Sequence, residues 1–381
     1  MSVIRPRPPE DPLIHEAIGA DGRPWEPAAL AGKLEAIRGE ILANPCGVDL
    51  PTALLEEYGS RRPESRMTRI LADARQLRDT VDRLVVVAGA SIAPATRLLV
   101  AACCHPFHDQ LPRGDRGGRP RLAWVDTDDD NDRLQGIVDV VAPEGRPPSS
   151  DLLDQWAILA VDSGEREPAP LASVQFLASV LTKAIASDSH AVADRIVAIA
   201  RTGSPLAVWA EGLGCVPRFH GESKIDGAEG VFTAAALLPA AMSGINIVRL
   251  LEGAAAMLVR FAEAPVATNP VLADATMRWR AAREEGRDAS VFLGGGKALA
   301  ELSVWSRHVR PAPAGAAAIV THVAIAEPRR DRVVPPRVVR AGSANHRLTI
   351  QLPRLDEHAI GQLLQLVILS TSVERRLHEA V

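Results

Sequence analysis

Short apolar runs alternate with longer amphipathic segments along most of this chain of 381 residues. Each run is rich in Val, Ile, Leu and Ala and is bounded by polar or turn-forming residues, which is typical of buried strands. The runs predict strands at Arg83–Ala88, Arg121–Asp126, Gly136–Ala142, Trp156–Asp162, Ala289–Leu293, Ala317–Ile325 and Arg347–Leu352. Because strands that alternate with helices form parallel sheets, the pattern predicts an α/β protein with helices on both faces of its sheets.

The longer segments have apolar residues at helical spacing. They predict a helical region from Glu26 to about Val81 and helices at Thr96–Cys104, Ala172–Ser187, His190–Thr202, Phe232–Met242, Val248–Phe261, Val271–Glu285, Lys297–His308 and Leu355–Val381. Residues 1 to about 25 are Pro-rich and polar and are expected to be loosely attached. Surface loops are predicted at Pro143–Ser150, Arg310–Pro313 and Arg329–Arg337.

Composition and charge exclude several function classes. The 43 Lys and Arg residues are balanced by 47 Asp and Glu, so no basic excess indicates nucleic-acid binding. The apolar run Val231–Met242 contains Pro239 and is too short to span a bilayer. The first residues do not have the form of a signal peptide. We therefore expect a cytoplasmic protein whose partners include neither nucleic acid nor a membrane.

No cofactor and no metal site are expected. The acidic stretch Asp126–Asp132 lacks the glycine and the terminal Glu of an EF-hand, so a solvated or weakly cation-binding loop is expected. The cysteines lack the spacing of metal ligands and are expected to be reduced thiols: Cys46, Cys103, Cys104 and Cys215.

The stretch Leu84–Ser91 is the most informative local pattern, since an apolar run ends in Gly-Ala-Ser just before a predicted helix. A helix N-terminus offers free backbone N–H groups and the positive end of the helix dipole, which suit a phosphate group. An ordinary strand-to-helix connection has the same pattern, so both interpretations stay open.

Four segments, taken in their order, resemble the glucose-6-phosphate isomerase family. Cys104–His108, together with Arg116–Arg121 and Asp130–Gly136, resembles the linker and second strand of some bacterial members. Val85–Ser91 resembles the family's apolar strand ending in Gly-Ile-Gly-Gly-Ser, and Ala160–Gly164 lies where the family has Ser-Lys-Ser-Gly-Thr. Gly230–Ile247 resembles the opening of the family's second domain, Gly-Gly-Arg-Phe-Ser followed by a Val-Gly-Leu-Leu-Pro helix. Asn269-Pro270 and Leu352–Asp356 fit its later landmarks, so the resemblance covers roughly Arg69 to Glu379.

The resemblance implies a particular architecture. It implies two sugar-isomerase (SIS-type) domains, each a doubly wound parallel sheet in an α-β-α sandwich. We expect a helical extension at residues 1–68, a first domain at 69–205 and a second domain at 206–381. A homodimer is one expected assembly.

The resemblance also implies a ligand and a reaction. The family interconverts glucose 6-phosphate and fructose 6-phosphate through an enediol, with a Glu as the base. The residues that the resemblance places at the phosphate group are Gly89, Ser91, Ser163, Gly164 and Thr233.

The departures from the family fall at positions that carry chemistry. Pro311 stands about where the Glu base is expected, and a proline cannot accept a proton. Val231 replaces an Arg that would stabilise enediolate charge, and Asp162 replaces the Lys of the phosphate loop. Glu222 and His322 are the remaining candidates for a catalytic side chain, with a solvated loop and a structural role as the respective alternatives.

Three functions therefore stay open. The chain is an isomerase with residual or altered activity, a catalytically dead relative that senses a sugar phosphate, or a scaffold subunit that keeps only the fold. The missing Glu and Arg favour the last two. We expect sugar-phosphate binding to be weak or lost.

Overall fold

The computed structural model describes residues 12–18, 25, 27–89, 92–126, 129–147, 149–162, 169–185, 192–215, 228–294, 296–327 and 347–380. Its contacts divide the chain into two compact units. Unit 1 draws on Met1–Arg66, Ala101–Cys103 and Asn246–Val381, and unit 2 draws on Met67–Val100 and Cys104–Ile245. The helical N-terminal region thus groups with the C-terminal part of the chain, and residues 206–245 group with unit 2.

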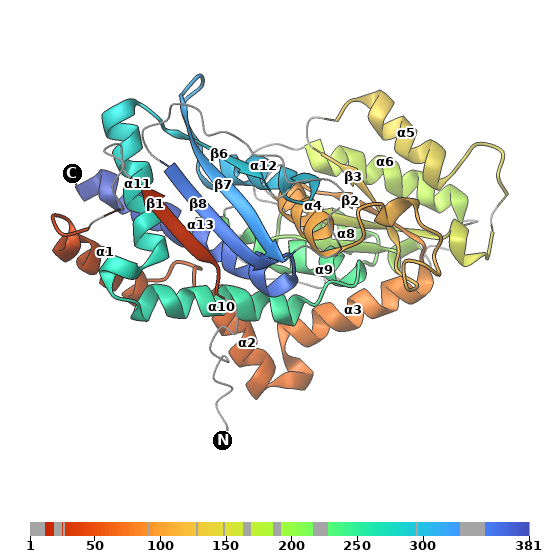
Figure 1. Ribbon diagram of the computed structural model, residues 1–381. Coiled ribbons are helices and arrows are strands. Elements are labelled where there is room, and N and C mark those ends of the chain that lie inside the picture. The colour runs from red at the N-terminus through yellow and green to blue at the C-terminus, as the bar shows by residue number, and fades with distance from the viewer. Residues whose placement is uncertain are drawn as a thin grey trace. The chain divides into compact units, whose positions relative to one another are not determined.

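Unit 2 is built on a four-stranded parallel sheet (Figure 1). Its strand order is β3 (Arg121–Val125), β2 (Arg83–Val87), β4 (Trp156–Val161) and β5 (Ile196–Ile199). Every residue of β4 and β5 is buried, so both faces of these strands are covered. This double burial explains the continuous apolar runs, and it confirms the parallel α/β class predicted from them.

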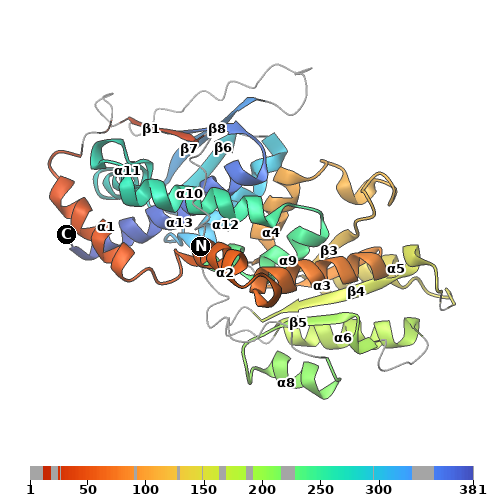
Figure 2. The ribbon, with the colours of Figure 1, turned by 90° about the horizontal axis from the view of Figure 1, so that it is seen from below.

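Helices lie on both faces of this sheet. Figure 2 shows α3 and α6 on opposite sides of the strands, and α6 packs against β2 and β4. The helices of this part of the chain are α3 (Arg66–Thr80), α4 (Ile92–Cys103), α5 (Asn131–Val141), α6 (Ala169–Ala184), α8 (Pro205–Gly212) and α9 (Ala234–Met242).

The prediction of a strand at Gly136–Ala142 is wrong, because this segment lies in α5. The side chain of Asp130 accepts a hydrogen bond from the backbone N–H of Arg133 at 2.8 Å and so caps the helix. Ile137 and Val138 are buried whereas Val140 is 56% exposed, so the apolar residues follow the helical period. The cap outweighs the strand preference of the β-branched residues.

The prediction of a helix at His190–Thr202 is also wrong, since β5 (Ile196–Ile199) occupies its centre. These four residues pair with β4 in the register Ile158 to Ile196. Strand formation here depends on the neighbouring strand rather than on local periodicity.

Unit 1 contains a second four-stranded sheet, in the order β1 (Ile14–Ile18), β8 (Arg347–Arg354), β7 (Ala318–Glu327) and β6 (Ala289–Gly294). β6, β7 and β8 are parallel, which confirms three predicted strands. β1 pairs antiparallel with β8.

β1 corrects the expectation that residues 1 to 25 are loosely attached. Leu13 is completely buried, its N–H donates to Oε1 of Gln362 at 3.2 Å, and its carbonyl accepts from Arg260 at 2.7 Å. The sequence pattern missed this strand because its partners are more than 200 residues away.

The helices of unit 1 pack mainly on α13. The two closest approaches occur at glycines of α10 and α13: a Cβ at Gly253 would lie 2.0 Å from the carbonyl oxygen of His358, and one at Gly361 would lie 2.0 Å from that of Leu250. Only glycine permits this backbone contact. The helices are α1 (Ala31–Ala43), α2 (Leu50–Ser60), α10 (Ile247–Glu263), α11 (Pro270–Glu285), α12 (Ala300–Val309) and α13 (Glu357–Ala380).

The sheet of unit 1 has one buried face and one partly exposed face. Ile319, Thr321 and Val323 alternate with Val320 and His322, which are only half-buried. Figure 2 shows α10, α11 and α13 on one side of these strands. Short 3-10 helices complete the described chain: η1 (Arg62–Glu64), η2 (His108–Gln110), η3 (Leu152–Asp154), η4 (Ala228–Phe232), η5 (Val266–Thr268) and η6 (Gly296–Leu299).

Candidate functional site

The sheet of unit 2 reverses its winding direction at β2. The chain crosses from β2 to β3 on one side and then returns past β2 to β4 and β5 on the other. Parallel crossovers are right-handed, so connections that run in opposite directions leave from opposite faces of the sheet. The loops after β2 and β4 therefore diverge, and open α/β sheets bind ligands at such a reversal, outside the carboxyl ends of the strands.

The strand register places specific residues at this edge. Val87 on β2 is paired with Val125 on β3 and with Ala160 on β4. Gly89 follows the end of β2 by two residues and Asp162 follows the end of β4 by one, so both lie at the carboxyl edge of neighbouring parallel strands. The predicted phosphate turn and the predicted phosphate loop therefore both begin at this edge.

The turn after β2 is described as far as Gly89, which is buried. α4 begins at Ile92, and the N–H groups of Ile92 and Ala93 donate to the Gly89 carbonyl at 3.1 and 3.3 Å. Three of the predicted phosphate-binding residues lie outside the described residues: Ser91, Ser163 and Gly164.

Asp162 brings a carboxylate to the reversal point. Its backbone N–H donates to the carbonyl of Ile199 at 2.9 Å, so the β4–β5 pairing holds its position. A carboxylate about 4 Å from a phosphate oxygen repels it by roughly 1–4 kcal/mol, depending on the local dielectric constant. The charge at this position therefore opposes a phosphate dianion.

A second ionic group at this edge was missed by sequence reasoning. Arg97 of α4 donates from Nη1 to Oδ2 of Asp126, the residue after β3, at 2.7 Å. Its guanidinium carbon lies 5.8 Å from the ring centre of Trp124. No local spacing connects residues 29 positions apart, so only the β2–β3 pairing reveals the contact.

The acidic stretch that begins at Asp126 has structural roles where it is described. The Asp129 carboxylate accepts from the backbone N–H of Asp126 at 2.9 Å, and Asp130 caps α5. Within the described ranges, no group of three or more His, Cys, Asp or Glu side chains is arranged to hold a metal ion.

Thr233 lies in unit 2, directly before α9, and is buried. Its hydroxyl donates to the carbonyl of Gly230 at 2.8 Å. Val231, which replaces the expected Arg, is buried in the core. The phosphate role predicted for Thr233 stays a prediction.

The two candidate catalytic side chains are not assembled into a described site. Glu222 lies outside the described residues. His322 lies in unit 1, in the middle of β7, between Leu293 on β6 and Thr349 on β8. It therefore extends from a sheet face rather than from the carboxyl edge of the strand.

Unit 1 contains a buried polar network centred on Asp274 of α11. Arg278 donates to this carboxylate at 2.8 Å and also to the hydroxyls of Ser290 and Thr321 at 2.9 and 2.6 Å. His15 of β1 contacts Asp274 at 3.3 Å. Burial by itself raises the pKa of Asp274, but the Arg278 charge and the His15 hydrogen bond outweigh it, so the pKa lies well below its usual value. The carboxylate stays ionised and ties β1, β6 and β7 to α11.

Arg310 belongs to the same network and corrects one predicted surface loop. It is buried, donating to the Ser370 hydroxyl at 3.0 Å and lying 2.8 Å from the Glu374 carboxylate. The neighbouring Pro311 is exposed. Charge and proline content predicted the loop correctly for Pro311 but not for Arg310, whose partners are on α13.

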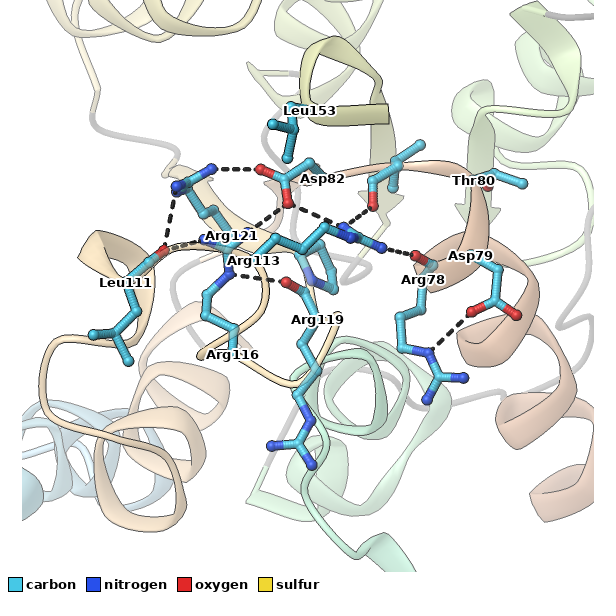
Figure 3. Close-up of polar contacts among 12 residues, drawn as sticks. Arg78, Asp79, Thr80, Asp82, Leu111, Arg113, Arg116, Arg119, Arg121 and Leu153 are labelled. Atoms are coloured by element: carbon cyan, nitrogen blue, oxygen red, sulfur yellow. Dashed lines mark hydrogen bonds and ion pairs between the residues drawn. The ribbon is translucent and has the colours of Figure 1, made fainter. Parts of the chain in front are cut away.

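Unit 2 contains a comparable buried carboxylate, Asp82, just before β2 (Figure 3). Arg113, Arg116 and Arg121 all contact it. Their remaining contacts include the carbonyls of Val81 at 2.9 Å and Arg119 at 2.9 Å. The cluster lies at the amino ends of β2 and β3, away from the carboxyl ends of the strands, and it holds the loop before β3 against the sheet.

These observations define a class of protein: a two-unit α/β protein with helices around two sheets whose strands are mainly parallel. A solved structure with this fold is a hypothetical protein from Thermus thermophilus, with a TM-score of 0.67 and 17% identity, covering 92% of this chain and 90% of that one. A glucose-6-phosphate isomerase from Chlamydia trachomatis gives a TM-score of 0.58 at 12% identity, covering 81% of this chain and 68% of that one. No protein-family model matches the chain.

The sequence relatives narrow this class. A glucose-6-phosphate isomerase from Rubrobacter xylanophilus is 27% identical over 295 residues, which are 77% of this chain and 62% of the relative. One from Symbiobacterium thermophilum is 28% identical over 263 residues, 68% of this chain and 53% of the relative. The chain is therefore similar in sequence to glucose-6-phosphate isomerases, as its motifs indicated, and it spans only 53–62% of the length of these two relatives.

The described helices include none that is both long and apolar enough to cross a membrane. None of the four cysteines forms a disulfide.

Proposed function

We propose that this chain binds a sugar phosphate at the carboxyl edge of the unit 2 sheet, and that it isomerises glucose 6-phosphate slowly or not at all. The observation that carries the proposal is the reversal of the sheet between β2 and β4, the strands that Gly89 and Asp162 follow. The reversal supplies the place for a ligand, whereas the carboxylate weakens the phosphate contact. The named relatives supply the substrate class.

Weak catalysis is the second part of the proposal. Isomerisation needs a base at the sugar carbon and a cation near the enediolate. Pro311 and Val231 stand at the positions that the resemblance assigns to these groups. Losing a general base typically costs on the order of 10² to 10⁴ in rate.

Two alternatives are a sensor that binds sugar phosphate without turnover and a scaffold subunit that keeps only the fold. Both alternatives share the fold and differ from the enzyme only in chemistry. A purified-protein assay that couples fructose 6-phosphate formation to a dye distinguishes the enzyme from both alternatives. We expect turnover near the uncatalysed background, and robust turnover would contradict the loss of catalysis.

Charge reversal at the phosphate loop tests the binding site. The resemblance puts Glu165, which lies outside the described residues, on the side of the phosphate loop where the family has Thr. Asp162→Lys combined with Glu165→Thr replaces repulsion by attraction, so we expect fructose 6-phosphate to bind at least about tenfold more tightly, as measured by calorimetry. Asp115→Lys is the matched control, because Asp115 is exposed and lies in the loop at the other end of the sheet. If neither the wild type nor the double variant binds at millimolar concentration, unit 2 has no phosphate site and the scaffold function is favoured.

A further inference from the structure

Arg97 occupies a position that no motif in the chain assigned to a ligand. It lies in the second turn of α4, whose N-terminus follows the Gly89 turn. Side chains on a helix incline toward its N-terminal end, and the contact with Asp126 shows that the guanidinium reaches the carboxyl end of β3. The cation therefore lies at the same edge of the sheet as Gly89 and Asp162.

Folding stability does not account for the ion pair between Arg97 and Asp126. The two side chains are 27% and 23% exposed, so solvent reaches both. Pairs of this kind contribute little to folding stability. The Trp124 ring and the Asp126 carboxylate instead hold a planar guanidinium in one orientation at an accessible place. A fixed guanidinium is well suited to two parallel hydrogen bonds with a phosphate.

The charges around β2 make Arg97 the decisive group. Asp126 follows the strand on one side of β2, and Asp162 follows the strand on the other. The Asp162 carboxylate repels an anion, whereas the Arg97 guanidinium of α4 attracts one and offsets the charge of Asp126.

We infer that Arg97 recognises the anionic group of the ligand, and that Asp126 orients the guanidinium and limits its affinity. This inference rests on the proposed sugar-phosphate site and names the residue that binds the phosphate group there. Asp126 competes with the ligand for the same cation. Removing its charge therefore strengthens ligand binding while it weakens the ion pair.

The test compares Arg97→Gln, Arg97→Lys, Asp126→Asn and the double variant Arg97→Gln with Asp126→Asn. Binding of fructose 6-phosphate and of fructose is measured by calorimetry on the full chain, with melting curves to verify folding. We expect Arg97→Gln to weaken fructose 6-phosphate binding at least tenfold, with Arg97→Lys between it and the wild type. Asp126→Asn should tighten binding severalfold, and the double variant should match Arg97→Gln. Arg75→Gln, at an exposed arginine of α3, is the matched control and should bind like the wild type.

Two outcomes overturn the inference while leaving the proposed function intact. In one, the wild type binds fructose 6-phosphate and Arg97→Gln binds it equally well. In the other, Asp126→Asn weakens binding as much as Arg97→Gln does, which identifies the pair as structural. If neither the wild type nor Asp126→Asn binds fructose 6-phosphate, the proposed function and the inference both fail. Equal loss of fructose and fructose 6-phosphate binding in Arg97→Gln also contradicts recognition of the phosphate.

Discussion

The two sheets of this protein have the same number of strands and parallel cores, but they differ in winding. In unit 2 the strand order β3-β2-β4-β5 reverses at β2, whereas in unit 1 the parallel strands β6, β7 and β8 follow one another in a single direction. A reversal separates neighbouring loops and creates a place for a ligand. The described parallel strands of unit 1 have no such reversal, so we propose the ligand site at the edge of the unit 2 sheet.

The two sheets resemble each other in how they use buried charge. Asp82 in unit 2 and Asp274 in unit 1 are each surrounded by arginines and are each shielded from water. Both lie away from the carboxyl edge of a sheet and join elements that are distant in sequence. Their role is to hold a loop or a strand in place rather than to bind a ligand.

Removing either buried carboxylate should have the largest effect on stability. Asp82→Ala leaves three guanidinium groups without a counter-charge, and Asp274→Ala leaves Arg278 without one. Breaking a buried pair in this way costs on the order of 3–5 kcal/mol. Urea unfolding should show a loss of that size for each variant. Asp79→Ala, at the exposed partner of Arg78, should cost less than about 1 kcal/mol.

Amide hydrogen exchange sharpens the comparison of the two units. Asp82→Ala should accelerate exchange mainly in β2 and β3, and Asp274→Ala mainly in β6 and β7. Equal acceleration in both sheets for each variant would contradict the division into two compact units.

Truncating Leu13 should have the next largest effect, because it tests the strand that the sequence pattern missed. Leu→Ala at a buried site costs about 2–5 kcal/mol, and Leu13 is completely buried. Ile14→Ala is the matched control, since Ile14 is 51% exposed and should cost far less. Equal unfolding free energies for the two variants would show that the residue that leads into β1 is not held against α10 and α13 in solution.

The smallest expected effect is on the pH dependence of folding stability. It involves His108, which lies in the loop that the Asp82 cluster holds against the sheet. Burial lowers the pKa of His108 below 6.5, although its hydrogen bond to the Pro120 carbonyl partly opposes the shift. The unfolded chain then binds a proton more readily than the folded chain, so stability falls as pH drops below 6.5. His108→Gln should remove this part of the pH dependence in melting curves between pH 7 and about pH 5.

His105→Gln is the control for this measurement, because His105 is exposed in the same loop. It should keep the wild-type slope of melting temperature against pH. If His108→Gln also keeps that slope, burial of His108 does not contribute to the pH dependence.

The local sequence was sufficient to predict a helix or strand where the neighbouring elements favour the same secondary structure as the segment itself. β2, β4 and α10 lie close to their predicted ranges, because a long apolar run or a long amphipathic period determines burial wherever the segment packs. The turn at Gly89 was likewise located from the chain alone, since strand, glycine and helix follow one another directly.

Segments whose partners are distant could not be predicted in this way. β1 and β5 become strands because β8 and β4 offer them hydrogen bonds, and Arg310 is buried because α13 supplies its partners. Local patterns carry no information about such pairings.

The sequence by itself determined the α/β class, the family resemblance and the charge changes at Asp162, Val231 and Pro311. Only the tertiary structure decided which charged residues lie with Asp162 at one edge of a sheet. The physical reason is that strand order and register bring Gly89, Arg97, Asp126 and Asp162 together across 73 positions of sequence, from Gly89 to Asp162. Electrostatic interactions depend on that distance in space and not on separation along the chain.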